Sequence, residues 1–441
     1  MMKKNSGAAL TLGFALFAMF FGAGNLILPP FIGLKAGENW PEAILGFFTT
    51  GIISPFLGVL TVVLFGNRFT DLGRRTHPVV IWALAFLIML CIGPLVAIPR
   101  TGATTFEIGI KPLFPEMSSI LFAVLFFAVV YFLSASKARI VDIIGNVLTP
   151  LLLLSLSILV IRGTMFPSAV PEEGLMQPLE AYLFSFYEGY QTLDVLASVI
   201  FAGIIISAAK QKGFTTPKSK FAITMQAGVI SMLGLLFIYG GLIFLGAHSG
   251  MADSENLSRT ELLLYISNSI LGSNGSYVIS VAVAFACLTT AIALVSAMGS
   301  FLEELTRGHL KYQWGVLITC LISGVLSVRS VDEIIEYAVV ILGFIYPITF
   351  TLIIILLLFG KRVFSKKPYM WSLGVSGLVS LLGVLEYFEL FSSGTSTIRN
   401  ILPFSEYQLD WVIPALITFL LVYVIDPSRR SEEALGSKQL D

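Results

Sequence analysis

The sequence predicts an integral membrane protein with an all-α fold that crosses the bilayer twelve times. Of its 441 residues, 56% are hydrophobic and only 12% are charged, and the mean hydropathy is +0.89. A soluble domain does not have this composition. The charged residues gather between long apolar runs, which is the pattern of a polytopic protein. We therefore expect a lipid bilayer to be the first partner of this chain.

Windows of about 20 apolar residues define the individual spans. Most of the 27 Lys and Arg residues lie in alternate connectors, beginning with the N-terminus. Basic residues collect on the cytoplasmic side, so both termini are predicted to be cytoplasmic and no nucleic-acid partner is implied. The twelve predicted spans are 7–35, 41–66, 79–106, 118–135, 140–161, 178–209, 220–247, 275–302, 312–328, 333–360, 370–390 and 410–425.

The first span contains a stretch that an ordinary membrane helix would avoid. Residues 21–30 read Phe-Gly-Ala-Gly-Asn-Leu-Ile-Leu-Pro-Pro. Glycine and proline weaken or remove helical hydrogen bonds at a depth where an unpaired backbone group costs several kcal/mol. A helix broken at mid-membrane would instead line a polar cavity with its freed groups and bind an ion or a small zwitterion. A simple kink packed against a neighbouring helix is the alternative.

The sixth span has a similar interruption. Residues 184–194 read Phe-Ser-Phe-Tyr-Glu-Gly-Tyr-Gln-Thr-Leu-Asp. Two carboxylates at that depth are costly unless they face protein or water. An interfacial segment with a re-entrant turn is the competing interpretation.

Breaks in spans one and six occupy corresponding positions of two five-helix halves. Because the first span runs outward and the sixth inward, the halves would be inverted repeats, as in LeuT, with the binding site where the broken helices meet. The predicted units are a first repeat at 7–165, a second repeat at 178–365, helices 11 and 12 at 366–428, and a cytoplasmic tail at 429–441.

Three motifs resemble the bacterial branched-chain amino acid symporters, the BrnQ-like or LIVCS family. They read Phe-Gly-Ala-Gly-Asn-Leu-Ile-Leu-Pro-Pro-Phe at 21–31, Gly-Pro-Leu-Val-Ala-Ile-Pro-Arg-Thr at 93–101 and Glu-Gly-Tyr-Gln-Thr-Leu-Asp at 188–194. The resemblance covers the chain essentially end to end. It implies a LeuT-like fold in the bacterial plasma (inner) membrane and import of leucine, isoleucine and valine by sodium symport. Gln191 departs from the more apolar residue expected at its position.

A zwitterionic amino acid suits two broken helices, because a broken helix presents N–H donors and C=O acceptors at one place. We expect the backbone of residues 23–25 to bind the carboxylate and the freed backbone of 187–190 to help hold the ammonium. Two aromatic side chains, Phe186 and Tyr190, are candidates for the apolar pocket, although aromatics in membrane spans more often pack. The predicted substrate site is Ala23, Gly24, Asn25, Phe186, Tyr187, Glu188, Gly189 and Tyr190.

The eighth span reads Ala-Cys-Leu-Thr-Thr at 286–290. In LeuT-like sodium symporters a carbonyl and two neighbouring hydroxyls in such a pattern hold one ion between spans one and eight. Sodium prefers several oxygens, and hydroxyls add no charge to the membrane. The alternative is a Thr hydroxyl bonded to the carbonyl one turn back. The resemblance implies as sodium ligands Ala18, Phe21, Ala286, Thr289 and Thr290.

Arg100 lies 23 residues after His77, which is about 35 Å along an outward-running helix. This spacing predicts a position near the external interface. There the side chain would either reach water or form an external gate with Glu333 or Glu336, which open the tenth span on the same side.

Other function classes fit less well. A membrane enzyme needs a nucleophile with its base, or a metal cluster, and no span contains either. The three cysteines lie within apolar segments, and no Walker A motif is present. We therefore expect no enzymatic activity and no cofactor other than a coupling ion. A proton-coupled symporter on the same fold stays open, and a polytopic membrane enzyme is the less favoured alternative.

Overall fold

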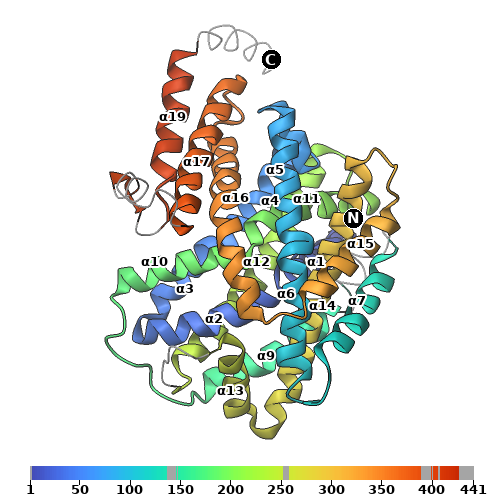
Figure 1. Cartoon of the computed structure of the whole chain (residues 1–441), viewed down its shortest axis with the longest axis vertical. Helices are drawn as coiled ribbons and strands as arrows, with labels where there is room; N and C mark the ends of the chain where they lie inside the picture. Colours follow the sequence, from blue (N-terminus) through green and yellow to red (C-terminus); the bar gives the residue numbers. More distant parts are fainter. Residues whose placement is uncertain are drawn as a thin grey trace.

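The computed structural model describes residues 2–136, 146, 148–251, 258–388, 399, 401–405 and 408–426. Within these ranges every regular element is helical (Figure 1). The predicted tail at 429–441 and most of the connector that precedes the fifth span lie outside the described residues.

The helices follow the apolar runs. The first part of the chain forms α1 (Met2–Phe20), α2 (Ala23–Ala36), α3 (Trp40–Phe48), α4 (Ser54–Phe65), α5 (Pro78–Leu90), α6 (Ala97–Thr104), α7 (Ser119–Ser134) and α9 (Thr149–Met165). The second part forms α10 (Pro178–Glu188), α11 (Asp194–Gln211), α12 (Pro217–Ala247), α13 (Arg259–Leu271), α14 (Gly275–Leu305), α15 (Tyr312–Leu326), α16 (Val331–Phe359), α17 (Lys366–Tyr387) and α19 (Val412–Ile425).

Many of these helices can cross a bilayer. Among the described residues, seven helical segments are long and apolar enough to do so by length and composition. Shorter apolar helices of 10–17 residues lie in each of the other predicted spans. The all-α membrane fold is thus confirmed, whereas the number of twelve spans stays a prediction.

The first span is broken where its glycines predict. α1 ends at Phe20 and α2 begins at Ala23. The N–H of Gly22 donates to the carbonyl of Phe20 at 2.9 Å and not to Ala18, its acceptor in a continuous helix. The Ala18 carbonyl therefore loses its helical partner in the middle of the protein.

The break in the sixth span lies within the predicted stretch at 184–194, in its second half. α10 ends at Glu188, a tight 3₁₀ turn spans Gly189–Thr192, and α11 begins at Asp194. Leu193 joins them with a φ of 68°, a left-handed conformation that a branched residue rarely adopts. This residue turns the chain so that Asp194 starts a new helix inside the protein.

Each broken span packs against a helical span of the other predicted half. α1 and α2 lie against α12, while α10 lies against α3 and α11 against α4. The broken span of each predicted half therefore contacts the second span of the other half, as inverted repeats would. Beside them, α16, α17 and α19 form one edge of the molecule (Figure 1).

Glycines bring α2 and α12 into backbone contact. A Cβ atom added to Gly33 would lie 2.8 Å from the Ala247 nitrogen, and one added to Gly246 would lie 2.7 Å from the Pro30 carbonyl carbon. Small residues allow such close approach between membrane helices. This contact fixes the outer half of the first span against the second half of the chain.

Gly33→Leu should therefore destabilise the fold, because overpacking a tight contact costs about 1–3 kcal/mol. We expect a lower melting temperature for the purified variant in detergent. Gly374→Leu is the control, since a Cβ there meets no atom within 4 Å. Equal melting of the two variants would contradict the packing argument.

Candidate functional site

A small cavity of about 20 Å³ lies between the two breaks. Its wall includes Gly22 and Asn25 from the first break, Thr192 and Asp194 from the sixth, and Arg100 from α6. A space of this size holds about one water molecule. A ligand larger than water would therefore fit only if the cavity expanded.

Asn25 and Asp194 connect the two breaks directly. The Nδ2 of Asn25 donates to the Asp194 carboxylate and to the Tyr239 hydroxyl, which is 2.6 Å away. All three side chains are at most 4% exposed. Asp194 and Tyr239 were not assigned from the sequence. Asp194 could have been, since a carboxylate at the start of a half-helix in mid-membrane is itself a functional signal.

Arg100 lies in this cavity wall and not at the external interface, so its predicted position is wrong. The side chain is 3% exposed, and Nη1 donates to the Gln191 carbonyl at 3.1 Å. Two features explain the error. The span is kinked at Gly93, whose ψ is −124°, and helical turns continue past Arg100 to Ile110. The true end of the span thus lies about 15 Å beyond Arg100.

The predicted gate is consequently absent from this structure. Glu333 and Glu336 are exposed, and Glu333 pairs with Arg329 at 3.5 Å on the surface. A buried guanidinium cannot reach either carboxylate.

The surroundings of Arg100 would suit an anion. Its Nε is buried without a hydrogen-bond partner, and a Cβ on Gly24 would lie 2.7 Å from its Cζ. Gly24 is in the first turn of α2, whose N–H groups have no partner within the helix and carry the positive end of its dipole. Among the described residues no ion pair joins Arg100 to Asp194. Two positive groups thus adjoin where the predicted carboxylate site of Ala23, Gly24 and Asn25 lies.

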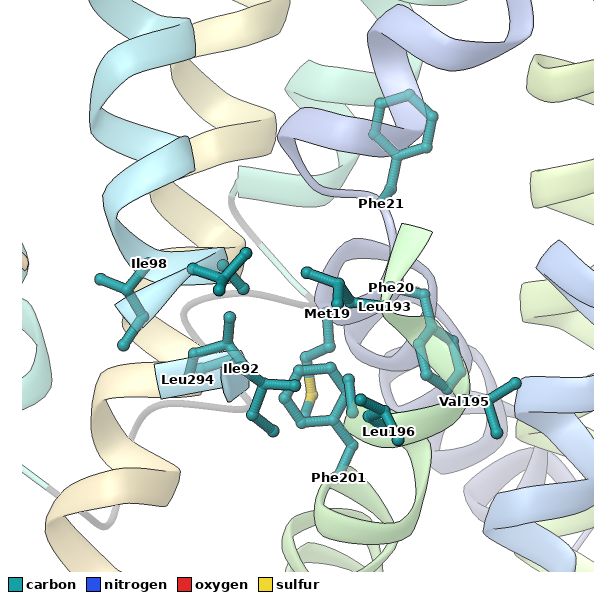
Figure 2. Packing of buried hydrophobic residues seen from close by; sticks show 14 of the residues in the cluster. Met19, Phe20, Phe21, Ile92, Ile98, Leu193, Val195, Leu196, Phe201 and Leu294 are labelled. Carbon is teal, nitrogen blue, oxygen red and sulfur yellow. The ribbon is translucent and has the colours of Figure 1, made fainter. Parts of the chain in front are cut away.

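Apolar side chains from four helices close the rest of the cavity. Figure 2 shows Met19, Phe20, Ile92, Phe201 and Leu294 gathered where α1 ends. These residues, and not the predicted aromatic pair, form the apolar wall of the central cavity.

The predicted aromatic pair lies elsewhere. Tyr190 packs on Tyr346 with ring centroids 4.3 Å apart, and Phe186 packs on Tyr190. Neither lines the central cavity, because the 3₁₀ turn directs this part of the break toward α16. Gly189 is pressed against Thr50, whose hydroxyl donates to the Phe186 carbonyl at 2.7 Å.

Glu188 pairs with Arg259 and not with Arg100. Its carboxylate lies 3.6 Å from the Arg259 guanidinium, and both side chains are largely buried. The same guanidinium lies 4.7 Å from the ring centroid of Phe31 in α2. Arg259 begins α13, so it ties this helix to the outer halves of both broken spans. Neighbouring Tyr187 is partly buried and lines a separate cavity beside α16.

The five residues predicted as sodium ligands come together. The Thr289 hydroxyl lies 3.2 Å from the Ala18 carbonyl and 2.9 Å from that of Ala286. The Thr290 hydroxyl lies 3.2 Å from the carbonyls of both Ala18 and Phe21. Three carbonyl and two hydroxyl oxygens thus cluster between α1 and α14.

The helix break explains this cluster. The Ala18 carbonyl has lost its helical donor, and an unpaired acceptor inside the protein is costly. The bonds of Thr290 run to the first span alone, so local bonding one turn back does not explain it. Thr289 makes both a local bond and a cross-span bond. Five uncharged oxygens form a donor set suited to a hard monovalent cation.

A much larger cavity of about 1,150 Å³ lies nearby, between α5, α11 and α14. Ile200 and Ile204 belong to its wall and flank Phe201, which lines the central cavity. It reaches the surface at Arg68, whose side chain is 64% exposed, on the basic side predicted to be cytoplasmic. An apolar layer that includes Phe201 and Leu294 thus separates the central cavity from this vestibule.

The fold matches solved transporters at low sequence identity. Mhp1, a nucleobase-cation-symport-1 family transporter solved closed with bromovinylhydantoin bound, aligns with a TM-score of 0.62 at 14% identity over 95% of this chain and 93% of its own. MhsT in complex with L-phenylalanine aligns with a TM-score of 0.59 at 15% identity, covering 94% and 98%. The chain therefore has the LeuT-like fold.

Curated relatives are closer in sequence. The chain is 37% identical to the branched-chain amino acid permease BraB of Bacillus subtilis (strain 168), over 96% of this chain and 97% of that protein. It is 32% identical to a putative branched-chain amino acid carrier protein of Staphylococcus aureus (strain bovine RF122 / ET3-1), over 98% and 100%. The family model for branched-chain amino acid transport proteins matches residues 5–429. The chain belongs to this family of membrane transporters.

Proposed function

We propose that the protein imports leucine, isoleucine and valine by sodium symport, through alternating access to a site between the two broken spans. The observation that carries this proposal is the placement of Arg100 and Asp194, two buried groups of opposite charge on the wall of one cavity. Charged side chains inside a membrane protein are expensive and mark ligand paths. A zwitterionic ligand would pair its carboxylate with Arg100 and its ammonium with Asp194.

The substrate carboxylate would bind Arg100 and the first-turn N–H groups of α2. The ammonium would donate to Asp194, which Asn25 orients. The branched side chain would then lie against the apolar wall of Met19, Phe20, Ile92, Phe201 and Leu294. A hydrophobic pocket distinguishes one methylene by only about 1–3 kcal/mol, which suits a carrier that accepts three similar amino acids.

Release would follow movement of the apolar layer between the central cavity and the 1,150 Å³ vestibule. In this arrangement the predicted external side is closed by α13, through the contacts of Arg259 with Glu188 and Phe31. Sodium bound at the Thr289 and Thr290 cluster would join α1 to α14. The ion would thereby couple its own binding to the position of the broken span.

Leucine uptake into proteoliposomes tests the proposal directly. We expect an inward sodium gradient to drive accumulation without a proton gradient. The buried Asp194 carboxylate could carry a proton, so coupling to protons is the second candidate. Full uptake driven by a proton gradient alone would establish that candidate in place of sodium.

Thr289→Val keeps the side-chain shape and removes one of the five oxygens. The sodium concentration for half-maximal leucine uptake should rise several-fold, because the cation loses a ligand. Thr319→Val is the matched control, since its hydroxyl bonds only the Gly315 carbonyl one turn back. The sodium site is refuted if both variants titrate like the parent.

Arg259→Gln should loosen the external closure, because removing one partner of a buried ion pair leaves the other charge uncompensated. We expect faster labelling of a cysteine at Thr192 by an impermeant thiol reagent added outside intact cells. Arg329→Gln, which removes the exposed pair with Glu333, should change nothing. Unchanged labelling in both variants would leave α13 without a gating role.

A further inference from the structure

The third span is interrupted just before it brings Arg100 to the central cavity. α5 ends at Leu90, and α6 begins only at Ala97. In a continuous helix the carbonyl of Leu95 would accept from the N–H four residues later. That residue is Pro99, which has no N–H to donate. The Leu95 carbonyl therefore needs a donor from another element, because an unpaired backbone acceptor inside a membrane protein is costly.

Tyr337 of α16 supplies this donor. Its hydroxyl donates to the Leu95 carbonyl at 2.9 Å, and its side chain is partly buried. A second bond joins the same two elements near the end of the third span, where the Glu107 carboxylate accepts from the Val331 N–H at 2.9 Å. α16 is thus fastened to the third span both at its interruption and near its end.

The position of Arg100 depends on the main chain that Tyr337 holds. The Arg100 backbone N–H donates to the Val96 carbonyl at 3.1 Å, in the first turn after the interruption. Its guanidinium donates to the Gln191 carbonyl, while its Nε has no hydrogen-bond partner. A side chain with few bonds of its own is placed mainly by its backbone. A shift of the Leu95 carbonyl would therefore move the guanidinium relative to the first turn of α2.

α16 also contacts the turn that accepts the Arg100 guanidinium. Tyr346 packs on Tyr190 with ring centroids 4.3 Å apart, and Tyr190 directly precedes Gln191. Among the described residues, none from α16 lines the central cavity. This helix would therefore act on a bound substrate only through the two elements that hold Arg100.

We propose that Tyr337 is a positioning residue for the substrate carboxylate. Its hydrogen bond to the Leu95 carbonyl holds Arg100 beside the first turn of α2. This inference rests on the proposed function, since it requires Arg100 to bind the carboxylate. Without the Tyr337 hydroxyl, the substrate ammonium and the branched side chain would keep their contacts, and only the carboxylate would be bound more weakly.

Competition for radiolabelled valine uptake into proteoliposomes, driven by the gradient that the parent uses, tests this role. Tyr337→Phe removes the hydroxyl and keeps the ring. We expect the inhibition constant of leucine to rise several-fold. Isoamylamine, which has no carboxylate and is added at higher concentrations, should keep its inhibition constant. This split separates a role in placing Arg100 from general damage to the site.

Tyr369→Phe is the matched control. The Tyr369 hydroxyl also donates to a main-chain carbonyl at 2.9 Å, that of Val363, and Tyr369 does not line the central cavity. The control should leave both inhibition constants as in the parent. Melting temperatures in detergent separate the effect from unfolding, since each variant loses one hydrogen bond and the two should melt alike.

An unchanged leucine constant in Tyr337→Phe overturns the positioning role and leaves the proposed function standing. An equal rise for leucine and isoamylamine does the same, because the damage would then not be specific to the carboxylate. A parent that takes up no valine, or that binds isoamylamine as tightly as leucine, overturns both the positioning role and the proposed function.

Discussion

Backbone groups freed inside the membrane must find partners, and the rest of this site depends on that constraint. When α1 ends at Phe20, the Ala18 carbonyl loses its helical donor, and hydroxyls from α14 take its place. When α10 ends at Glu188, the Gln191 carbonyl is freed and Arg100 supplies the donor. In hydrocarbon these groups would be costly. The two breaks thus draw side chains from α6 and α14 to the centre of the protein.

Arg100 and Asp194 are buried charged groups on the wall of a cavity that holds about one water molecule. Arg100 donates to the Gln191 carbonyl, and the Asp194 carboxylate accepts from Asn25. Adding water around them would require the apolar layer at Phe201 and Leu294 to part. A zwitterion brings both missing charges and an apolar side chain at once. Its binding would therefore favour a different packing of the same layer, which is the basis of alternating access.

The sequence predicted what depends on local chemistry. Glycines and prolines at 22–30 located the first break, and the Ala-x-x-Thr-Thr pattern located oxygens that do converge on Ala18 and Phe21. Features that depend on how a helix bends and where it ends were not predictable from the sequence. A rise of 1.5 Å per residue placed Arg100 along its helix, but it did not reveal the kink at Gly93 or the extra turns to Ile110.

The same limit applies to the sixth span. A left-handed residue at Leu193 decides that Asp194 faces the centre while Tyr190 faces α16. No propensity favours that conformation in a branched residue, so tertiary packing must impose it. The sequence therefore identified the segment that forms the site but not which of its side chains enter it.

The central claim is that Arg100 and Asp194 bind the two charged ends of one substrate. Ala97 lines the same cavity. A cysteine at Ala97, with the three native cysteines replaced by alanine, reports occupancy through its rate of alkylation. We predict that leucine with sodium slows alkylation, whereas isoamylamine and 4-methylpentanoate, which each lack one charged end, do not at the same concentration. Equal protection by either analogue would contradict the claim.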